Sequence, residues 1–361
     1  MFSKAKSFKK ALAVLSAAIL MSTTLAVVPV TASTNVAAAS VSTTRGTTGD
    51  CTWKIENDTL TISGKGEMGD YSVYNRNLAP WSGYEFSKVV IENSVTNIGN
   101  CAFVCQSNLK SVTIPNSVKI IGLSAFEGCS GLESVKIPNS VKYIQDYAFS
   151  GCTSLKTVSI PSSVTYISFG AFSGCTSLKT VKIPNSVIDI NYGAFGLCTS
   201  LKSVTIPNSV KTIDEAAFYG CKNLTSVTIG NSVKSIGYGA FANCDNLEFV
   251  TIPKSVTCIA DYAFAYCSAG TAIMKVDLTI VGSKGSKAET YANENGLKFV
   301  LAGDVNGDGE VSIKDATMIQ YYLAKLKTLN KTQLKAADIN NDGTVSIADV
   351  TKIQYILAGL E

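Results

Sequence analysis

The sequence predicts a β-rich solenoid of eight 23-residue turns with a cap at each end, followed by a small all-α module that contains two calcium-loop/helix motifs. Two observations carry this prediction. Eight Ala-Phe pairs recur every 23 residues through the middle of the chain, and a twelve-residue acidic pattern occurs twice near the C-terminus. A third feature, an apolar run behind four lysines at the N-terminus, predicts a secretory signal peptide.

The repeat is recognised from its phenylalanines, which are Phe103, Phe126, Phe149, Phe172, Phe195, Phe218, Phe241 and Phe264. Within one unit, the alternation of Val135 and Ile137 predicts a short strand. Pro138 ends that strand, because proline cannot donate to a continuing ladder. One such turn cannot bury its own apolar face, but stacked turns bury a shared one.

Most of the eleven cysteines belong to the same repeat. Seven hold one position in it: Cys129, Cys152, Cys175, Cys198, Cys221, Cys244 and Cys267. Equivalent side chains on stacked turns point the same way, so we expect inward-facing thiols that pack as small apolar groups. In the first repeat Gln106 takes this position and Cys105 is displaced by one, so Cys101 and Cys105 could pair locally. Cys51 and Cys258 receive no role.

The C-terminal pattern reads DVNGDGEVSIKD and, 34 positions later, DINNDGTVSIAD. Calcium prefers six to eight oxygens, which an EF-hand loop supplies from positions 1, 3, 5, 7, 9 and 12 around a glycine at 6. The predicted ligands of two Ca²⁺ ions are Asp304, Asn306, Asp308, Glu310, Ser312 and Asp315 in the first loop, and Asp338, Asn340, Asp342, Thr344, Ser346 and Asp349 in the second. Gly309 and Gly343 stand at the turn.

Both loops depart from the general EF-hand pattern, because they close with Asp where that pattern has Glu. Apolar-periodic segments follow each loop, at residues 316–326 and 350–360, and no comparable helix precedes the first loop. Both departures are typical of type I dockerins, which the region from Gly303 to Glu361 resembles. The resemblance implies calcium-dependent attachment to a cohesin domain of a cellulosome scaffold, in the context of polysaccharide degradation.

The resemblance also implies which residues meet cohesin, since dockerins use loop positions 10 and 11 and the helix that follows. Carried over by position, these are Ile313, Lys314, Gln320, Tyr321 and Lys325 in the first copy, and Ile347, Ala348, Gln354 and Tyr355 in the second. The two copies match closely, so either could present the same face after a half-turn. The alternative for Ile313 and Ile347 is that they pack the two helices together.

The motif LxxVxIPNSVxxIxxxAFxGC resembles the leucine-rich repeat of the BspA type, found on bacterial surface proteins. The expected domains are a signal peptide at 1–32, with cleavage as late as 39, an N-terminal cap at 41–88, repeats at 89–267, a C-terminal cap at 268–302 and the dockerin at 303–361. An uncleaved anchor is the alternative for the N-terminus. With cleavage, we expect a secreted protein without a stable membrane anchor, held near the cell surface through a cellulosome.

Composition excludes several function classes. The formal charge of +4 equals the four lysines of the first ten residues, and there are only two arginines, so nucleic acid is not an expected partner. There is no histidine, which removes Ser-His-Asp and Cys-His catalysis and His-ligated metal sites.

Binding residues of a repeat scaffold are sought at its variable outward positions. Aromatic side chains can stack on sugars or anchor a protein partner, and the candidates are Tyr147, Phe169, Tyr192, Tyr238 and Tyr262. The alternative is that neighbouring aromatics pack against each other. Carboxylate pairs such as Asp214 with Glu215, or Asp189 with Asp261, could serve a glycosidase, but a regular solenoid offers no deep cleft to separate their pKa values.

The sequence therefore predicts a non-catalytic secreted protein, in which the repeats bind a protein or carbohydrate partner and the dockerin binds cohesin. Two alternatives stay open. One is a polysaccharide hydrolase subunit, and the other is a surface adhesin whose calcium loops are only structural.

Overall fold

The computed structural model describes residues 44–264, 266–268, 272–274 and 277–360, so the predicted signal peptide lies outside the described residues. The chain forms two compact units. The first reaches Val164 and includes Ser168–Leu178 and Gly193–Cys198. The second consists of Thr165–Ile167, Lys179–Tyr192 and the chain from Thr199 onward.

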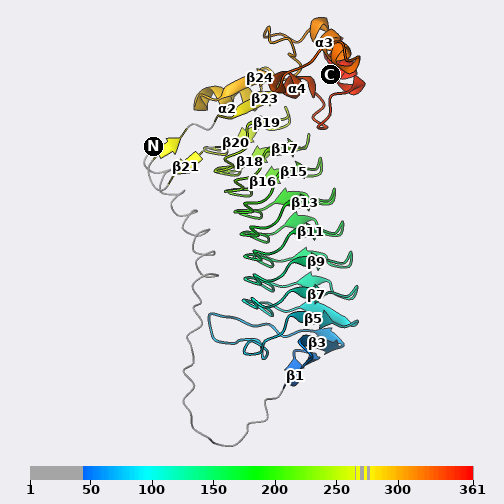
Figure 1. Ribbon diagram of the computed structural model, residues 1–361, viewed down its shortest axis with the longest axis vertical. Helices are drawn as coiled ribbons and strands as arrows, with labels where there is room; N and C mark the ends of the chain where they lie inside the picture. Colours follow the sequence, from blue (N-terminus) through cyan, green and yellow to red (C-terminus); the bar gives the residue numbers. More distant parts are fainter. Residues whose placement is uncertain (1–43, 265, 269–271, 275–276, 361) are drawn as a thin grey trace, which may run out of the picture. The chain divides into compact units, whose positions relative to one another are not determined.

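The first unit begins with an antiparallel meander of three strands that continues into parallel repeat strands (Figure 1). Its main sheet contains β1 (Arg45–Thr48), β2 (Cys51–Glu56), β3 (Thr59–Gly64), β5 (Lys88–Ile91), β7 (Ser111–Thr113), β9 (Ser134–Lys136) and β11 (Thr157–Ser159). A second sheet contains β4 (Gly66–Glu67), β6 (Val95–Ile98), β8 (Ile120–Ile121) and β10 (Tyr143–Ile144). Each turn therefore carries two short strands, of which the sequence predicted only the first.

The second unit repeats this arrangement. One series of parallel strands consists of β13 (Thr180–Lys182), β15 (Ser203–Ile206), β17 (Ser226–Ile229), β19 (Phe249–Thr251), β23 (Thr279–Gly282) and β24 (Lys298–Leu301). The other consists of β12 (Tyr166–Ile167), β14 (Asp189–Ile190), β16 (Thr212–Ile213), β18 (Ser235–Ile236) and β20 (Cys258–Ile259). β21 (Tyr266–Ser268) and β22 (Ala272–Met274) form a separate hairpin.

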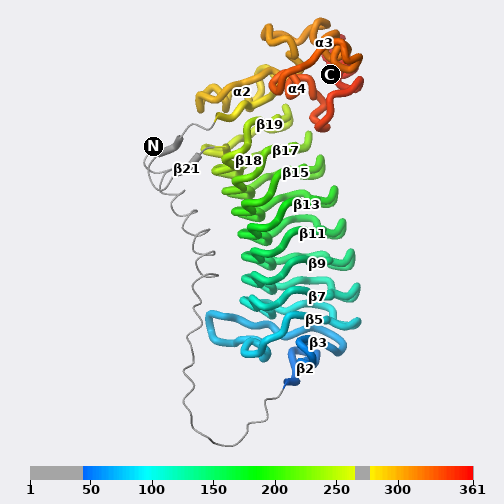
Figure 2. Tube along the Cα trace, in the orientation of Figure 1, coloured from blue at the N-terminus to red at the C-terminus, as the bar shows by residue number. Residues whose placement is uncertain are grey.

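Register within both units follows the 23-residue period. Ser134 pairs with Ser111 and with Thr157, and Ser203 pairs with Ser226. Equivalent residues therefore pair on successive turns. Within each unit, the tube in Figure 2 shows these turns stacked one on the next. The predicted solenoid is confirmed, with about nine turns instead of eight.

The additional turn is explained by the N-terminal cap. Trp81 is fully buried and stacks on Phe103 at 5.6 Å between ring centroids, as one repeat phenylalanine stacks on the next. Its indole Nε1 donates to the carbonyl of Ala102 at 2.8 Å. A tryptophan thus takes the phenylalanine position in a turn that lacks the Ala-Phe signature, which the 23-residue count missed.

Phenylalanine rings form the centre of the repeat core. Phe126 and Phe149 lie 5.2 Å apart with nearly parallel planes, and Phe149 and Phe172 lie 5.5 Å apart. In the second unit, Phe264 ends the column against Tyr291 at 5.8 Å in an edge-to-face contact. Offset and edge contacts of this kind add to area burial, by about 0.5–1.5 kcal/mol a pair.

Tyr291 belongs to α2 (Lys287–Asn295), which is capped by Ser286 and ends at Gly296 with φ 61°. This helix connects β23 to the parallel strand β24, so the closing element is a strand, a helix and a further strand. The chain then passes directly into α3 (Ile313–Leu323), α4 (Lys331–Ala337) and α5 (Ile347–Leu357). The structure therefore confirms a helical C-terminal region.

The cysteine position of the repeat is part of this core. Cys129, Cys152, Cys175, Cys198, Cys221 and Cys244 are buried free thiols, and the side chain of Cys267 lies outside the described ones. Five of these thiols donate a hydrogen bond to the backbone carbonyl of the phenylalanine 26 residues earlier, as Cys175 does to Phe149 at 3.2 Å. The other four are Cys129, Cys152, Cys198 and Cys244. The predicted cysteine ladder is therefore confirmed for the six side chains that the structure describes. Cys101 and Cys105 are also free thiols.

We expect these thiols to be unreactive in the folded protein. Burial raises the pKa of Cys175 to about 12, so roughly one thiol in 10⁴ is ionised at pH 8, and the side chain is enclosed as well. Cys258 is exposed. A maleimide pulse read by peptide mass spectrometry should label Cys258 within minutes and Cys175 only after denaturation. Equal labelling of the two in the native protein would contradict a packed thiol ladder.

Candidate calcium and partner-binding module

The two acidic segments form loops of the same construction. Each begins with a buried aspartate, Asp304 or Asp338, and leads into an eleven-residue helix, α3 or α5. Ser312 and Ser346 cap these helices, and the aspartate three residues later completes each capping box. Loop position 9 thus starts the helix and position 12 lies in its first turn.

First-position aspartates organise each loop from within. The carboxylate of Asp304 accepts hydrogen bonds from the backbone amides of Gly307, Asp308 and Gly309, at 2.7 to 3.1 Å. Asp338 accepts from Asp342 and Gly343 at 3.1 Å. Hydrogen bonds to a charged acceptor are stronger than those to a neutral one, so each carboxylate stabilises the folded conformation of its loop.

The aspartates that close the two loops, Asp315 and Asp349, are completely buried. Asp315 accepts hydrogen bonds from the amides of Val305, Asn306 and Ser312, at 2.8 to 2.9 Å. Asp349 does the same with the amides of Asn340 and Ser346. The shorter side chain of Asp is therefore accommodated because the loop backbone folds onto it.

Middle positions carry further oxygens on the exposed side. The amide oxygen of Asn306 accepts from the backbone of Asp308, and Asp308 accepts from the backbone of Glu310 at 3.1 Å. Asn340 and Asp342 repeat both contacts, with Thr344 in the place of Glu310. All twelve predicted ligand residues thus lie in two loops with matching hydrogen bonds.

Backbone conformation requires glycine at position 6. Gly309 and Gly343 have φ values of 88° and 92°, a region that side chains other than glycine rarely adopt. At position 4, Gly307 and Asn341 also have positive φ, of 79° and 58°. Asparagine tolerates this conformation better than most residues.

The electrostatics of the second loop fit a cation. Burial, followed by the neighbouring carboxylates of Asp349 and Asp342, raises the pKa of Asp338. Carboxylates that oppose one another's ionisation are stabilised by a positive ion between them. Among the residues that the structure describes, no three His, Cys, Asp or Glu side chains converge as ligands, so amide, hydroxyl and backbone oxygens must complete either set.

Helix α4 was not predicted. It begins at the Asn330 N-cap, where Asn330 and Gln333 form a reciprocal capping box. This Asn-x-x-Gln pattern was a usable signal, although the helix has only seven residues. Its function is structural, because Ala336 and Ala337 are buried and Gln333 donates to the carbonyl of Val305 at 3.2 Å.

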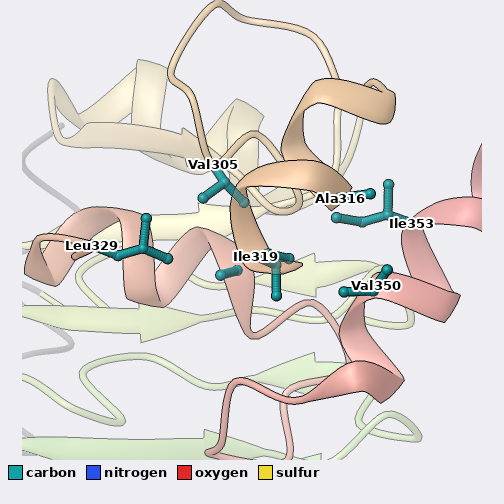
Figure 3. Close-up of a cluster of buried hydrophobic side chains, with 7 residues drawn as sticks. Val305, Ala316, Ile319, Leu329, Val350 and Ile353 are labelled. Carbon is teal, nitrogen blue, oxygen red and sulfur yellow. The ribbon is translucent and has the colours of Figure 1, made fainter. Parts of the chain in front are cut away.

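An apolar cluster joins the three helices. Figure 3 shows this cluster. It contains Val305 from the first loop, Ala316 and Ile319 from α3, and Val350 and Ile353 from α5. Leu329 and Ala337 complete this cluster from the α4 side. The two acidic loops are therefore held by one common core.

Side chains predicted to meet a partner lie outside this core. Ile313 and Ile347 are 59% and 63% exposed, so the alternative that they pack the helices together is wrong. Lys314, Gln320, Tyr321, Lys325, Ala348, Gln354 and Tyr355 are also exposed. Both copies therefore present the same residue types to solvent: an isoleucine, a glutamine and a tyrosine.

Aromatic candidates on the repeats are instead half-buried, namely Tyr147, Phe169, Tyr192, Tyr238 and Tyr262. Tyr147 packs edge-to-face on Phe169 at 5.0 Å, and Tyr238 on Tyr262 at 5.4 Å. Burial, with Glu215 and Asp214 nearby, raises the pKa of Tyr192 to about 12. These contacts support packing between neighbouring aromatics as their main role.

Comparison with protein families matches residues 81–198 and 146–271 to the BspA type Leucine rich repeat region, in 6 copies. The chain belongs to this family of leucine-rich repeat proteins. Residues 302–357 match the Dockerin type I domain, a domain type that binds calcium and implies a cohesin-type partner. No catalytic domain was found, and no curated protein matches.

Solved structures similar to this leucine-rich repeat protein are themselves leucine-rich repeat proteins. One from T. pallidum is 30% identical, covering 55% of this chain and 88% of that one, with a TM-score of 0.43. A leucine rich cell surface protein from Faecalibacterium prausnitzii is 24% identical, covering 74% and 97%, with a TM-score of 0.34. One from Eubacterium ventriosum is 18% identical, covering 63% and 96%, with a TM-score of 0.33.

The two domain types together indicate a secreted or cell-surface protein with a non-catalytic, cellulosome-type binding role. None of the helices in the described part of the chain is both long enough and apolar enough to cross a bilayer.

Two isoleucines of α3 test the division between core and surface. We expect Ile319→Ala to lower the free energy of unfolding of the dockerin by about 2–5 kcal/mol, because Ile319 is fully buried. Ile313→Ala should change it by less than about 0.5 kcal/mol, because Ile313 is mostly exposed. Denaturant unfolding followed by α3 hydrogen exchange measures both. A loss for Ile313→Ala as large as for Ile319→Ala would place Ile313 in the core.

Proposed function

We propose that this protein is a non-catalytic subunit of a cellulosome, with its dockerin bound to a scaffold cohesin and its repeats binding a protein or carbohydrate partner during polysaccharide degradation. The observation that carries the proposal is the duplicated, solvent-exposed face on α3 and α5. If the two calcium loops had only a structural role, the same Ile, Gln and Tyr would not need to lie outside the core in both copies.

The proposed calcium sites use the two loops. Asp304, Asn306, Asp308, Glu310, Ser312 and Asp315 would hold one ion, and Asp338, Asn340, Asp342, Thr344, Ser346 and Asp349 the other. Bound calcium supplies the positive charge that offsets the crowded carboxylates. The chain itself positions the donors, through the amide hydrogen bonds to Asp304, Asp315 and their counterparts.

Cohesin would meet one of the two helical faces. Tyr321 and Tyr355 are about half-exposed, and tyrosine supplies large contact area at low cost in conformational entropy. Lys314 and Ala348 differ between the copies at loop position 11, as do Lys325 and Gly359 after the helices. The first copy therefore carries two more positive charges at these two positions, whereas the second copy has Lys352 where the first has Met318.

The signal peptide at 1–32, the cap at 41–88, the repeats at 89–267, the cap at 268–302 and the dockerin at 303–361 remain the proposed division of the chain. Cleavage of that peptide would release a chain that returns to the cell surface through its dockerin. Asp214 and Glu215, the adjacent carboxylates considered for a hydrolase, lie near Tyr192, and Asp214 is exposed to solvent.

Titration against a panel of cohesins, with calcium and with chelator, tests the proposal. We expect calcium-dependent binding that survives Tyr321→Ala or Tyr355→Ala alone and falls about thirtyfold or more in the double variant, because aromatic anchors commonly contribute over 2 kcal/mol. Tyr322→Ala is a poor control, since Tyr322 packs on the core. Lys327→Ala, in the exposed segment after α3, is the matched control.

Three results would count against this function. Cohesin binding that persists in chelator would show that the partner face does not need calcium. No binding to any cohesin, in a protein that still binds two calcium ions, would favour the surface adhesin. Hydrolysis of plant-wall polysaccharides that is lost on Glu215→Gln would favour the enzyme.

A further inference from the structure

The dockerin begins without a free linker. The amide of Ala302 donates to the carbonyl of Gly282 in β23, and the amide of Gly303 donates to Ala336 in α4, both at 2.8 Å. Gly303 has a φ of 92°, a backbone conformation that residues with a side chain rarely adopt, and a Cβ atom there would also lie 2.7 Å from Ile339 Cδ1. Two consecutive residues thus bond first to the cap and then to the dockerin, which places the helices directly beside the last strands.

The second acidic loop forms one wall of a groove on the repeats of the second unit. The groove has a volume of about 590 Å³ and is lined by residues at the ends of β15 and β17, such as Thr205 and Asn231, and by Asn340, Asn341 and Asp342. The side-chain Nδ2 of Asn341 donates to the carbonyl of Ile229 at 3.0 Å. The loop therefore satisfies a backbone acceptor at the end of a repeat strand.

A second contact lies on α4. Lys331 forms an ion pair with Glu248, and its Nζ lies 5.5 Å from the ring centroid of Phe249 in β19. An exposed ion pair alone contributes little, but the same ammonium also faces an aromatic ring. Lys331 and Asn341 thus contact two different turns of the repeats. Two separate contacts define the orientation of the dockerin on the repeats, whereas a single contact would let it rotate.

Asn341 occupies position 4 of its loop, between the predicted ligands Asn340 and Asp342. The equivalent residue of the first loop is Gly307, which has no side chain to donate. Most hydrogen bonds of the two loops match, but the amide of Gly307 donates to the side chain of Asp304, whereas the amide of Asn341 donates to the backbone carbonyl of Asp338. The side chain of Asn341 adds the bond to Ile229.

We propose that the groove at the ends of β15 and β17 is a docking surface for the second calcium loop, and that calcium binding at that loop and attachment of the dockerin to the repeats stabilise each other. The inference rests on the proposed function only in taking the loop as a calcium site. Ordering the loop around an ion presents Asn341 to Ile229. Docking in turn holds the loop in its ion-binding form, so each event raises the affinity of the other.

The docked arrangement leaves both partner faces open. Ile313, Tyr321, Ile347 and Tyr355 are all about half-exposed or more in the same structure. Docking therefore orients the dockerin on the repeats without competing with cohesin for either helix face.

Calcium titration of the full-length mature chain by calorimetry tests the coupling. We expect Lys331→Met to weaken one of two calcium sites about threefold, and Lys331→Met with Asn341→Gly to weaken it about tenfold. The direction is informative. By electrostatics alone, removing a positive charge should leave calcium binding unchanged or tighter, whereas loss of docking weakens it. Asn341→Gly reproduces the residue of the first loop and so keeps the backbone conformation.

Lys327→Met is the matched control, since it makes the same change of charge in the exposed segment before α4. It should leave both sites unchanged or slightly tighter. Hydrogen exchange supplies a second readout. Ser226–Asn231 should be protected by calcium in the wild type and not in the double variant, while α3 and α5 stay protected in both.

Outcomes separate this proposal from the function above. Unchanged or tighter calcium binding in the folded Lys331→Met protein would overturn docking and leave the cohesin proposal intact. A wild-type chain that binds no calcium would overturn both. Cohesin affinity at saturating calcium should be the same in the wild type and the double variant, and a fall in the double variant would show that the groove contacts belong to the partner site.

Discussion

Burial of one apolar face against the next turn is the interaction on which the whole molecule depends. No turn has a core of its own, so each phenylalanine and each inward thiol gains its environment from the neighbouring repeats. This explains why the ends differ from the middle. Trp81 covers the first phenylalanine and Tyr291 covers the last, and both do so from elements that lack the repeat motif.

The same dependence decides where variation is tolerated. Positions that touch the next turn repeat closely, while loop residues and outer strand residues vary. The aromatic candidates show the limit of this argument, because Tyr147 and Phe169 are variable and yet pack on each other. Variation between repeats therefore marks freedom from the core, and does not by itself mark a ligand site.

Much of the fold was predictable because the period determines which residues become neighbours. Ile319 and Ile353 could be assigned to the dockerin core from helical spacing, and the loops from their glycines and acids. The second strand of each turn escaped prediction because two residues give no alternation to detect. Ile313 and Ile347 were predicted to face a partner, but only with core packing as an alternative, since an isoleucine one position after a helix cap suits either a core or an interface. Contacts such as Asn341 to Ile229 join residues 112 apart and leave no local pattern.

One consequence of the direct passage from β24 into the first acidic loop is mechanical. A chain held by a scaffold at one end and by a partner on its repeats carries tension through the segment around Gly303. With no slack in that segment, stretching cannot be absorbed by a coil. Tension would reach the hydrogen bonds of β24 with β23 and those of the first loop at the same time, so calcium at this loop would also set the force that the attachment withstands.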